Sequence, residues 1–219
     1  MITPLDGPRR QPASGAPAKA LVVLLHGLGA DGADLIELAG PLARVLPEAA
    51  FVAPNAPEPC DSAPFGYQWF SFQDRDPRRL ARDADGAAAP LAGFIEAELA
   101  AHRLGMAQLA LVGFSQGTMM ALHLGLRLVP APAAIVGFSG ALLAPDRLAA
   151  ERRGAPPVLL IHGTEDGIVP FGMMAAAEAG LRAAGIPVET LACPGLPHGI
   201  DEAGVTAAAG FLRRHLGQG

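Results

Sequence analysis

A serine, an aspartate and a histidine, which together can perform nucleophilic catalysis, occur at the ends of apolar runs. The serine, Ser115, stands in the pentapeptide GFSQG, between one such run and a helix-like stretch. The pattern G-x-S-x-G in this context predicts a sharp strand-to-helix turn that presents a nucleophilic hydroxyl at a helix N-terminus. Ser115 is therefore the candidate nucleophile.

The candidate base and acid follow from chain order, which in enzymes with such a turn is serine, acid, histidine. Among the late histidines, His198 lies in the loop-like PGLPHG, whereas His215 lies in the final helix-like stretch. Only Glu165 and Asp166 directly follow an apolar run, in VLLIHGTEDGIVP. We expect Asp166, beside a glycine, to hold the imidazole of His198, and Glu165 to turn outward.

Other residues with chemical potential have simpler interpretations. Ser139, in GFSGAL, resembles a second nucleophile, but Ala141 stands where the second glycine is needed, so Ser139 is predicted to be a strand-end residue. His26 and His162 each close an apolar run, without a carboxylate motif beside them. We therefore expect structural histidines and no metal.

The stretch LLHGLGADG contains a G-x-G-x-x-G at Gly27, Gly29 and Gly32, which is compatible with two uses. A dinucleotide site needs an acid at the end of the second strand, but that run ends in VAPNAP. A serine hydrolase needs two N–H donors for the oxyanion, and the backbones of Leu28 and Gln116 supply them. The sequence thus favours an oxyanion hole and no cofactor.

The motifs HGLGADG, GFSQG, GFSG, HGTEDGIVP and PGLPHGI resemble the phospholipase/carboxylesterase family of small α/β-hydrolases, which includes acyl-protein thioesterases. The resemblance runs from about residue 21 to the end. It implies an α/β-hydrolase fold, the triad Ser115, Asp166 and His198, and an oxyanion hole at Leu28 and Gln116. These residues agree with those selected above by order and context.

The segment 54–82 shows no regular pattern and is predicted to be a substrate loop. It holds FGYQWFSF, in which alternation places Tyr67 and Trp69 on one face and Phe70 and Phe72 on the other. We expect Trp69 and Phe70 to wall an acyl pocket, with Ile168 as a further substrate contact. Family members commonly carry an acid after the Trp-aromatic pair, where this chain has serine.

Apolar runs alternate with helix-like stretches, which predicts an α/β fold whose mostly parallel central sheet has helices on both faces. A single domain over residues 1–219 is expected, with a Pro-rich leader, 1–19, that is either an edge strand or flexible. The predicted strands are 21–25, 50–53, 109–113, 134–138, 158–161 and 188–192. The predicted helices are 33–45, 87–102, 116–128, 172–184 and 202–215.

Charge and composition exclude several classes of partner. The 21 acidic residues outnumber the 16 basic ones, so the chain has no basic surface that would attract nucleic acid.

The first apolar run is too short for a signal peptide or a membrane span, so a cytoplasmic protein without stable membrane insertion is expected. Cys60 and Cys193 are predicted to be free thiols, although a disulfide is left open.

The sequence as a whole predicts a cofactor-free serine carboxylesterase that acts on short- to medium-chain carboxylic esters through an acyl-enzyme. The alternatives are an acyl-protein thioesterase or a lysophospholipase, because a triad does not distinguish leaving groups. A non-enzymatic ligand-binding module of the same fold would predict a damaged triad, which this chain does not show. The expected partner is a small-molecule ester or thioester, and a homodimer is left open.

Overall fold

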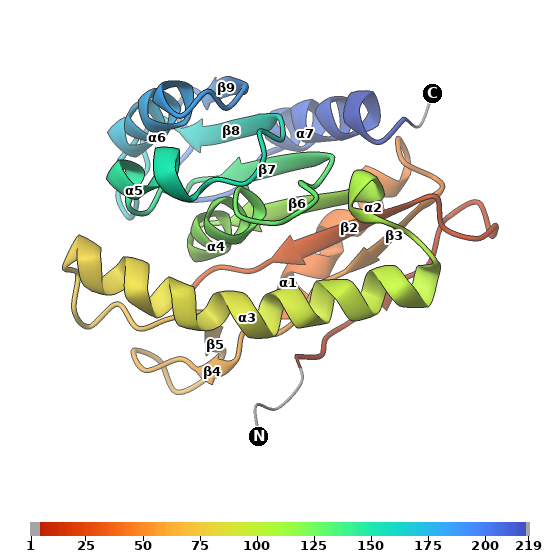
Figure 1. Cartoon of the computed structure of the whole chain (residues 1–219), viewed down its shortest axis with the longest axis horizontal. Coiled ribbons are helices and arrows are strands. Elements are labelled where there is room, and N and C mark those ends of the chain that lie inside the picture. The colour runs from red at the N-terminus through yellow and green to blue at the C-terminus, as the bar shows by residue number, and fades with distance from the viewer. Residues whose placement is uncertain (1–4, 218–219) are drawn as a thin grey trace.

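A seven-stranded sheet forms the centre of the computed structural model, which describes residues 5–217 (Figure 1). The strand order is β1-β3-β2-β6-β7-β8-β9, and every neighbouring pair is parallel except β1 with β3. The strands are β1 (Arg9–Arg10), β2 (Ala20–Leu25), β3 (Ala49–Val52), β6 (Leu109–Phe114), β7 (Ala134–Phe138), β8 (Val158–Gly163) and β9 (Val188–Cys193). A separate two-stranded sheet pairs β4 (Glu58–Pro59) with β5 (Tyr67–Gln68).

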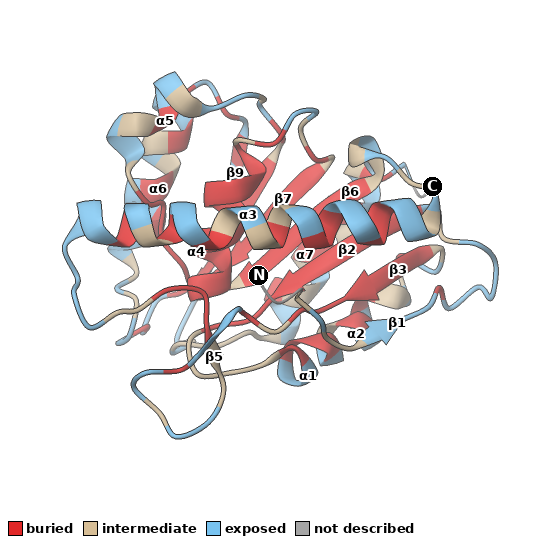
Figure 2. Ribbon diagram, turned by 60° about the horizontal axis from the view of Figure 1, so that its bottom comes forward, coloured by how far each residue is buried: buried red, intermediate tan, exposed pale blue. Residues whose placement is uncertain are grey.

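Helices cover both faces of the sheet, because alternate strand residues point to opposite sides. The buried strands cross the middle of the molecule in Figure 2. One core lies under α3 (Pro77–His102), α4 (Gln116–Gly125), α5 (Pro145–Glu151) and α6 (Gly172–Ala183) and takes Leu21, Val23 and Leu25 of β2. The other lies under α1 (Gly32–Leu35), α2 (Ala39–Ala43) and α7 (Glu202–His215) and takes Ala20, Val22 and Leu24.

The predicted strands are confirmed to within two residues, and the mostly parallel sheet is confirmed as well. Within the segment 1–19, β1 is a two-residue edge strand in which Arg9 pairs with Val52 and Arg10 with Phe51. Residues 1–4 lie outside the described residues. The antiparallel β1 therefore extends the sheet beyond β3.

Several helix predictions need correction. The expected helix 33–45 is divided into α1, a 3-10 turn η1 (Ile36–Leu38) and α2, and Pro41 within α2 lacks the N–H that a continuous helix would use. Helix α4 ends at Gly125, three residues earlier than expected, and α5 was missed. A second 3-10 turn, η2 (Met106–Gln108), precedes β6.

The segment 54–82 is less irregular than predicted. It contains the hairpin β4–β5, and α3 begins at Pro77 rather than at residue 87. The Asp76 carboxylate caps this helix by accepting the N–H groups of Arg78 and Arg79, while Pro77 occupies the first turn, where its missing N–H costs nothing. The irregular part thus shrinks to the neighbourhood of the hairpin.

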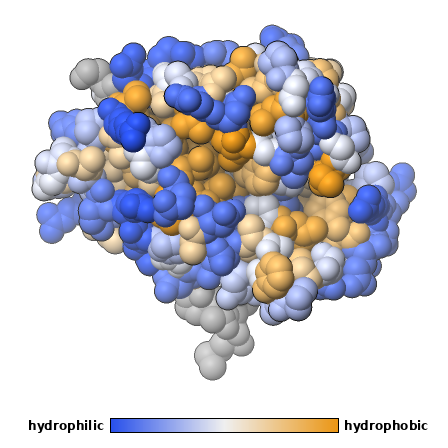
Figure 3. Space-filling view, turned by 180° about the vertical axis from the view of Figure 1, so that it is seen from behind, coloured by the Kyte–Doolittle hydropathy of each residue, from blue (hydrophilic) through white to orange (hydrophobic). Residues whose placement is uncertain are grey.

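The surface is largely polar, and Figure 3 shows apolar side chains gathered over the middle of one face with hydrophilic ones around them. Among the described residues, no helix is both long and apolar enough to cross a membrane. In the same part of the chain the exposed large apolar side chains are those of Phe65, Val129, Ile168 and, less so, Met173. Cys60 and Cys193 are buried free thiols, as predicted.

Candidate active site

The predicted site residues converge at one edge of the sheet. Leu28 follows β2, Ser115 follows β6, Asp166 follows β8 and His198 follows β9. Because these strands are parallel and adjacent or nearly so, their carboxyl ends meet at the same edge. This is where the fold can assemble a site from distant segments.

Ser115 occupies the strand-to-helix turn in a strained backbone conformation. Its φ is +54° and its ψ −116°, and it is the N-cap of α4. A Cβ at Gly113 would collide with the backbone of Gly117, and one at Gly117 would collide with the carbonyl oxygen of Leu25. Only glycine at both positions lets the turn close this tightly, so the pentapeptide forms a nucleophile elbow.

His198 and Asp166 form a hydrogen-bonded pair beside this elbow. The His198 Nδ1 atom lies 2.7 Å from Asp166 Oδ2, and the imidazole packs in a tilted orientation against the ring of Phe114, the residue before Ser115, with 4.8 Å between the ring centroids. No hydrogen bond joins Ser115 Oγ to His198 within residues 5–217. Such contacts often tighten only when substrate binds.

The Asp166 carboxylate is buried and held by several donors. Its Oδ1 accepts the N–H groups of Ile168 and Val169, each at 2.9 Å. Burial opposes its ionisation, but the hydrogen bonds from His198, Val169 and Ile168 outweigh burial and hold the pKa of this carboxyl below its ordinary value. Asp166 is therefore an anion able to orient and stabilise the imidazole of His198.

A second imidazole reaches the same carboxylate. His162 Nε2 lies 3.2 Å from Asp166 Oδ2 and 2.9 Å from the Val169 carbonyl oxygen, to which it donates. The His162 side chain is 2% exposed. The expectation of a buried, satisfied histidine is confirmed, but the sequence did not indicate that its partner is Asp166.

The two expected oxyanion donors flank Ser115. The backbone N–H groups of Leu28 and Gln116 form no hydrogen bond within the described part of the chain. A Cβ at Gly27 would lie 3.3 Å from the Ser115 Cβ, so the Leu28 loop passes directly beside the elbow. The arrangement is compatible with an oxyanion hole.

The Gln116 side chain, which sequence reasoning missed, links the elbow to the segment after β5. Its Oε1 accepts the Trp69 N–H at 2.9 Å, and its Nε2 donates to the Phe70 carbonyl oxygen at 2.7 Å. No motif signals this contact, because the partners are 46 and 47 residues apart in the chain. Gln116 thus has a structural side chain and a free backbone donor.

The prediction that Trp69 and Phe70 wall a pocket is wrong, because both are core residues. Their exposed fractions are 1% and 2%, and the Trp69 indole N–H donates to the His26 carbonyl oxygen at 3.0 Å. The expected alternation is confirmed: Tyr67 and Trp69 both lie against His26, whereas the Phe70 and Phe72 rings pack at 5.4 Å. The aromatic cluster therefore supports the site from inside.

A cavity of about 770 Å³ lies near the elbow instead, and its described lining includes none of the triad residues. Met119, one turn after Ser115, and Ile168 and Val169, whose N–H groups hold Asp166, belong to its lining. Ile168, for which a substrate contact is a prediction, is 74% exposed. The remaining apolar wall comes from the segment between β5 and α3, the start of α3, the loop after β7, and α6, and includes Phe72, Leu80, Leu142, Leu143 and Met173.

The other serine, acid and histidine near these strand ends have different surroundings. Ser139 is 1% exposed, and its Oγ has no hydrogen-bond partner among the described residues. Glu165 is exposed, as expected, and its N–H donates to the Leu196 carbonyl oxygen. His26 donates from Nδ1 to the Gly27 carbonyl oxygen and accepts the Ala56 N–H at Nε2, which fixes a neutral structural imidazole.

No cluster of three or more potential metal ligands occurs in the described ranges. The groups that meet at this edge of the sheet are a serine hydroxyl, an imidazole, a carboxylate and backbone N–H donors. These are the parts needed for acyl transfer through a covalent intermediate.

Comparisons with known proteins point to one family. The phospholipase/carboxylesterase family matches residues 12–216. Esterase YpfH of Escherichia coli K12 is 31% identical over 203 residues, which cover 90% of this chain and 83% of the relative. Acyl-protein thioesterase 1 of Schizosaccharomyces pombe is 35% identical over 172 residues, covering 72% and 73% of the two chains.

Among solved structures, that of esterase PE8 superimposes with a TM-score of 0.92 at 44% identity, covering 98% of this chain and 100% of the other. Fold, motifs and relatives thus agree with one another. The chain belongs to the phospholipase/carboxylesterase family of α/β-hydrolases.

Proposed function

We propose that this enzyme is a serine carboxylesterase that hydrolyses short- to medium-chain carboxylic esters through the triad Ser115, His198 and Asp166. The observation that carries the proposal is the 2.7 Å contact between His198 Nδ1 and Asp166 Oδ2, with the imidazole packed against the ring of the residue before the elbow serine. A buried carboxylate that fixes an imidazole beside a strained serine is the arrangement that activates a hydroxyl.

In the proposed mechanism His198 accepts the Ser115 proton while Ser115 Oγ attacks the ester carbonyl. The N–H groups of Leu28 and Gln116 stabilise the oxyanion, and His198 then returns the proton to the departing alcohol. Water hydrolyses the acyl-enzyme through the same relay. Asp166 keeps the proton on Nδ1 and stabilises the imidazolium as it forms.

The acyl part of the substrate is assigned to the apolar cavity beside the elbow. Each buried methylene contributes about 0.8 kcal/mol, so several contacts with this wall favour medium chains over acetyl. The names of the E. coli relative and of PE8 as esterases support a carboxylic ester. An acyl thioester is the second candidate, favoured by the S. pombe relative, an acyl-protein thioesterase.

The test is a panel of p-nitrophenyl esters from acetyl to octanoyl, with acyl thioesters of the same lengths. We expect kcat/KM to be higher for esters than for matched thioesters and to rise with chain length. Ser115→Ala should lower kcat/KM at least about 10³-fold without unfolding the protein, whereas Ser139→Ala retains most activity. A larger kcat/KM for thioesters would assign the second function, and full activity of Ser115→Ala would refute both.

A further inference from the structure

The outer part of the cavity carries a group of arginines that a purely apolar acyl chain would not need. Arg75, Arg78 and Arg82 belong to the lining, and all three are exposed. Arg78 and Arg82 are four residues apart on α3 and so share one helical face, and Arg75 lies just before the helix. We call these three residues the α3 arginines.

The α3 arginines differ from neighbouring arginines in having no carboxylate partner. Within residues 5–217 none of the three has an acidic oxygen within 4.0 Å, whereas Arg79, on the same helix, pairs with Asp83 at 2.9 Å. Arg147, also in the lining, is bound by Glu151 at 2.6 Å and by Asp85. Positive charge is therefore available at one side of the cavity.

The acidic groups nearby are few or already engaged. Asp146, in the first turn of α5, is the one acid among the lining residues that the structure describes. The Asp76 carboxylate accepts two backbone N–H groups at the start of α3, and that of Asp74 accepts the Asp76 N–H. The described lining thus holds three unpaired arginines and one uncommitted carboxylate, in a chain whose formal net charge is −5.

We propose that the enzyme prefers esters whose acyl chain ends in an anionic oxygen group, of which a carboxylate is the simplest. The apolar wall takes the methylenes next to the scissile carbonyl, and the α3 arginines take the terminal anion. Guanidinium groups keep their charge at all working pH values and match the two oxygens of a carboxylate. This inference rests on the proposed esterase function and specifies its substrate class.

The experiment compares p-nitrophenyl half-esters of adipic and suberic acid with the analogues that carry a terminal carboxamide. The two substrates of a pair share the leaving group, the chain length and nearly the same shape, and differ in the charge of the terminus. We expect kcat/KM at low ionic strength to favour the acid about tenfold, because three exposed charge pairs each contribute a factor of roughly two. Addition of 0.5 M salt should remove most of the preference.

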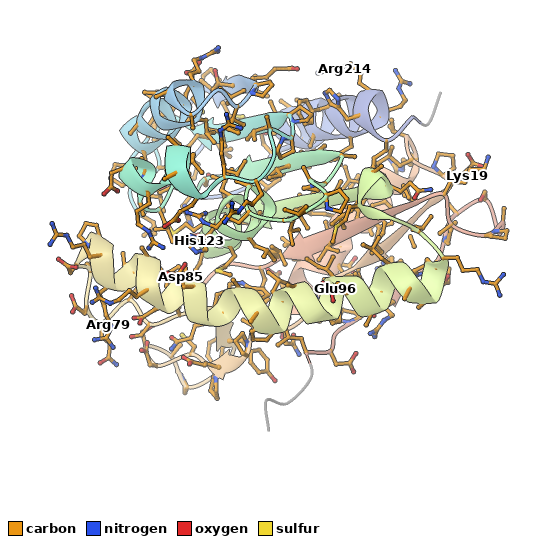
Figure 4. All side chains as sticks on the ribbon, in the orientation of Figure 1. Lys19, Arg79, Asp85, Glu96, His123 and Arg214 are labelled. Carbon is orange, nitrogen blue, oxygen red and sulfur yellow. The ribbon has the colours of Figure 1, made fainter. Side chains whose placement is uncertain are left out.

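The variant Arg75→Gln/Arg78→Gln/Arg82→Gln should reduce the acid-to-amide ratio to about one. The amide rate within the same variant shows that the protein is folded and active, and the salt titration of the wild type does not depend on any variant. Arg79→Gln is the matched control, since Arg79 lies on the same helix (Figure 4) but outside the cavity lining, and it should keep the preference.

A wild-type ratio of one or below would overturn the inference, as would an unchanged ratio in the triple variant or an equal loss in Arg79→Gln. Uncharged esters such as the acetyl ester distinguish a wrong role for the α3 arginines from a wrong esterase proposal. Hydrolysis of acetyl esters without preference for the acid contradicts only the role of the α3 arginines. Absence of hydrolysis of both the acetyl and the octanoyl ester contradicts the esterase proposal itself.

Discussion

The Asp166 carboxylate receives more donors than an orienting residue needs. Two backbone N–H groups bind Oδ1, and two imidazoles approach Oδ2. His162 also donates to the Val169 carbonyl oxygen, so it ties the carboxylate to the loop that lines the cavity. We therefore treat His162 as a positioning residue for the proposed triad.

Two replacements of His162 distinguish a role in positioning Asp166 from a role in filling space. His162→Leu removes the N–H donor and should lower kcat at least about tenfold with little change in KM, because Asp166 loses one restraint while the cavity keeps its lining. His162→Gln, which can still present an N–H to the loop, should restore much of kcat. Equal kcat for both variants, or a parallel change in KM, would show that His162 only fills space.

At the scale of residues, the sequence predicts the site where a motif determines the local backbone conformation. Glycines at 113 and 117 mark the elbow, and the pairing of His198 with Asp166 was expected from chain order. Trp69 was misplaced because alternation shows which residues share a face but not which face is the core. The Gln116 and His162 contacts depend on long-range packing that no local pattern records.

At the scale of elements, β5 and Trp69, which follows it, act as a brace for the loop that carries Leu28. The Gly29 N–H donates to the Tyr67 carbonyl oxygen, and the Tyr67 N–H donates to the Ala30 carbonyl oxygen, both at 2.9 Å. Trp69 anchors this brace by inserting its ring into the core and bonding the His26 carbonyl oxygen. The proposed oxyanion donor is thus positioned by aromatic packing.

Truncation of Trp69 should therefore act on the fold and on all substrates alike. Trp69→Ala is expected to lower the free energy of unfolding by about 3–5 kcal/mol, as for other large buried aromatics, and to lower kcat/KM for acetyl and octanoyl esters by similar factors. Trp69→Phe keeps most of the packing and should lose about 0.5–1.5 kcal/mol with the indole hydrogen bond. Urea denaturation and the ester panel measure both. A loss confined to long chains would place Trp69 in the acyl pocket.

The strands were predictable because buried parallel strands are short, continuously apolar and bounded by loops. The start of α3 was missed because its signal is the Asp76–Pro77 cap and not apolar periodicity. Helix α5 was missed for a related reason, since its seven residues bury one side chain, that of Leu148. Short helices lack the repeated apolar face on which sequence reading depends.

At the scale of the whole molecule, buried histidines couple stability to pH. Burial lowers the pKa of His26, which lies between two backbone groups. Burial and then the Arg127 charge lower the pKa of His123, although its Nε2 bonds Asp85 at 2.8 Å between α3 and α4 (Figure 4). A pKa below the ordinary value in the folded state means that the unfolded chain binds more protons below about pH 6.5.

The free energy of unfolding should consequently fall as pH decreases from about 6.5 toward 5. The slope is at most about 1.4 kcal/mol per pH unit for each proton taken up on unfolding. Urea denaturation at pH 7.5 and 5.5 measures the change, and His123→Gln should make the slope shallower because it removes one of these titrating groups. Stability that stays constant or rises on acidification would contradict the assignment of neutral buried imidazoles.

The central claim is that His198 and Asp166 activate the hydroxyl of Ser115. A fluorophosphonate probe tests this claim directly, because covalent labelling of a serine requires an activated hydroxyl. The account predicts one label per chain, located on Ser115 by peptide mass spectrometry, absent in Ser115→Ala and slowed at least about 10³-fold in His198→Ala. A label on Ser139, or labelling of the wild type and His198→Ala at the same rate, would contradict it.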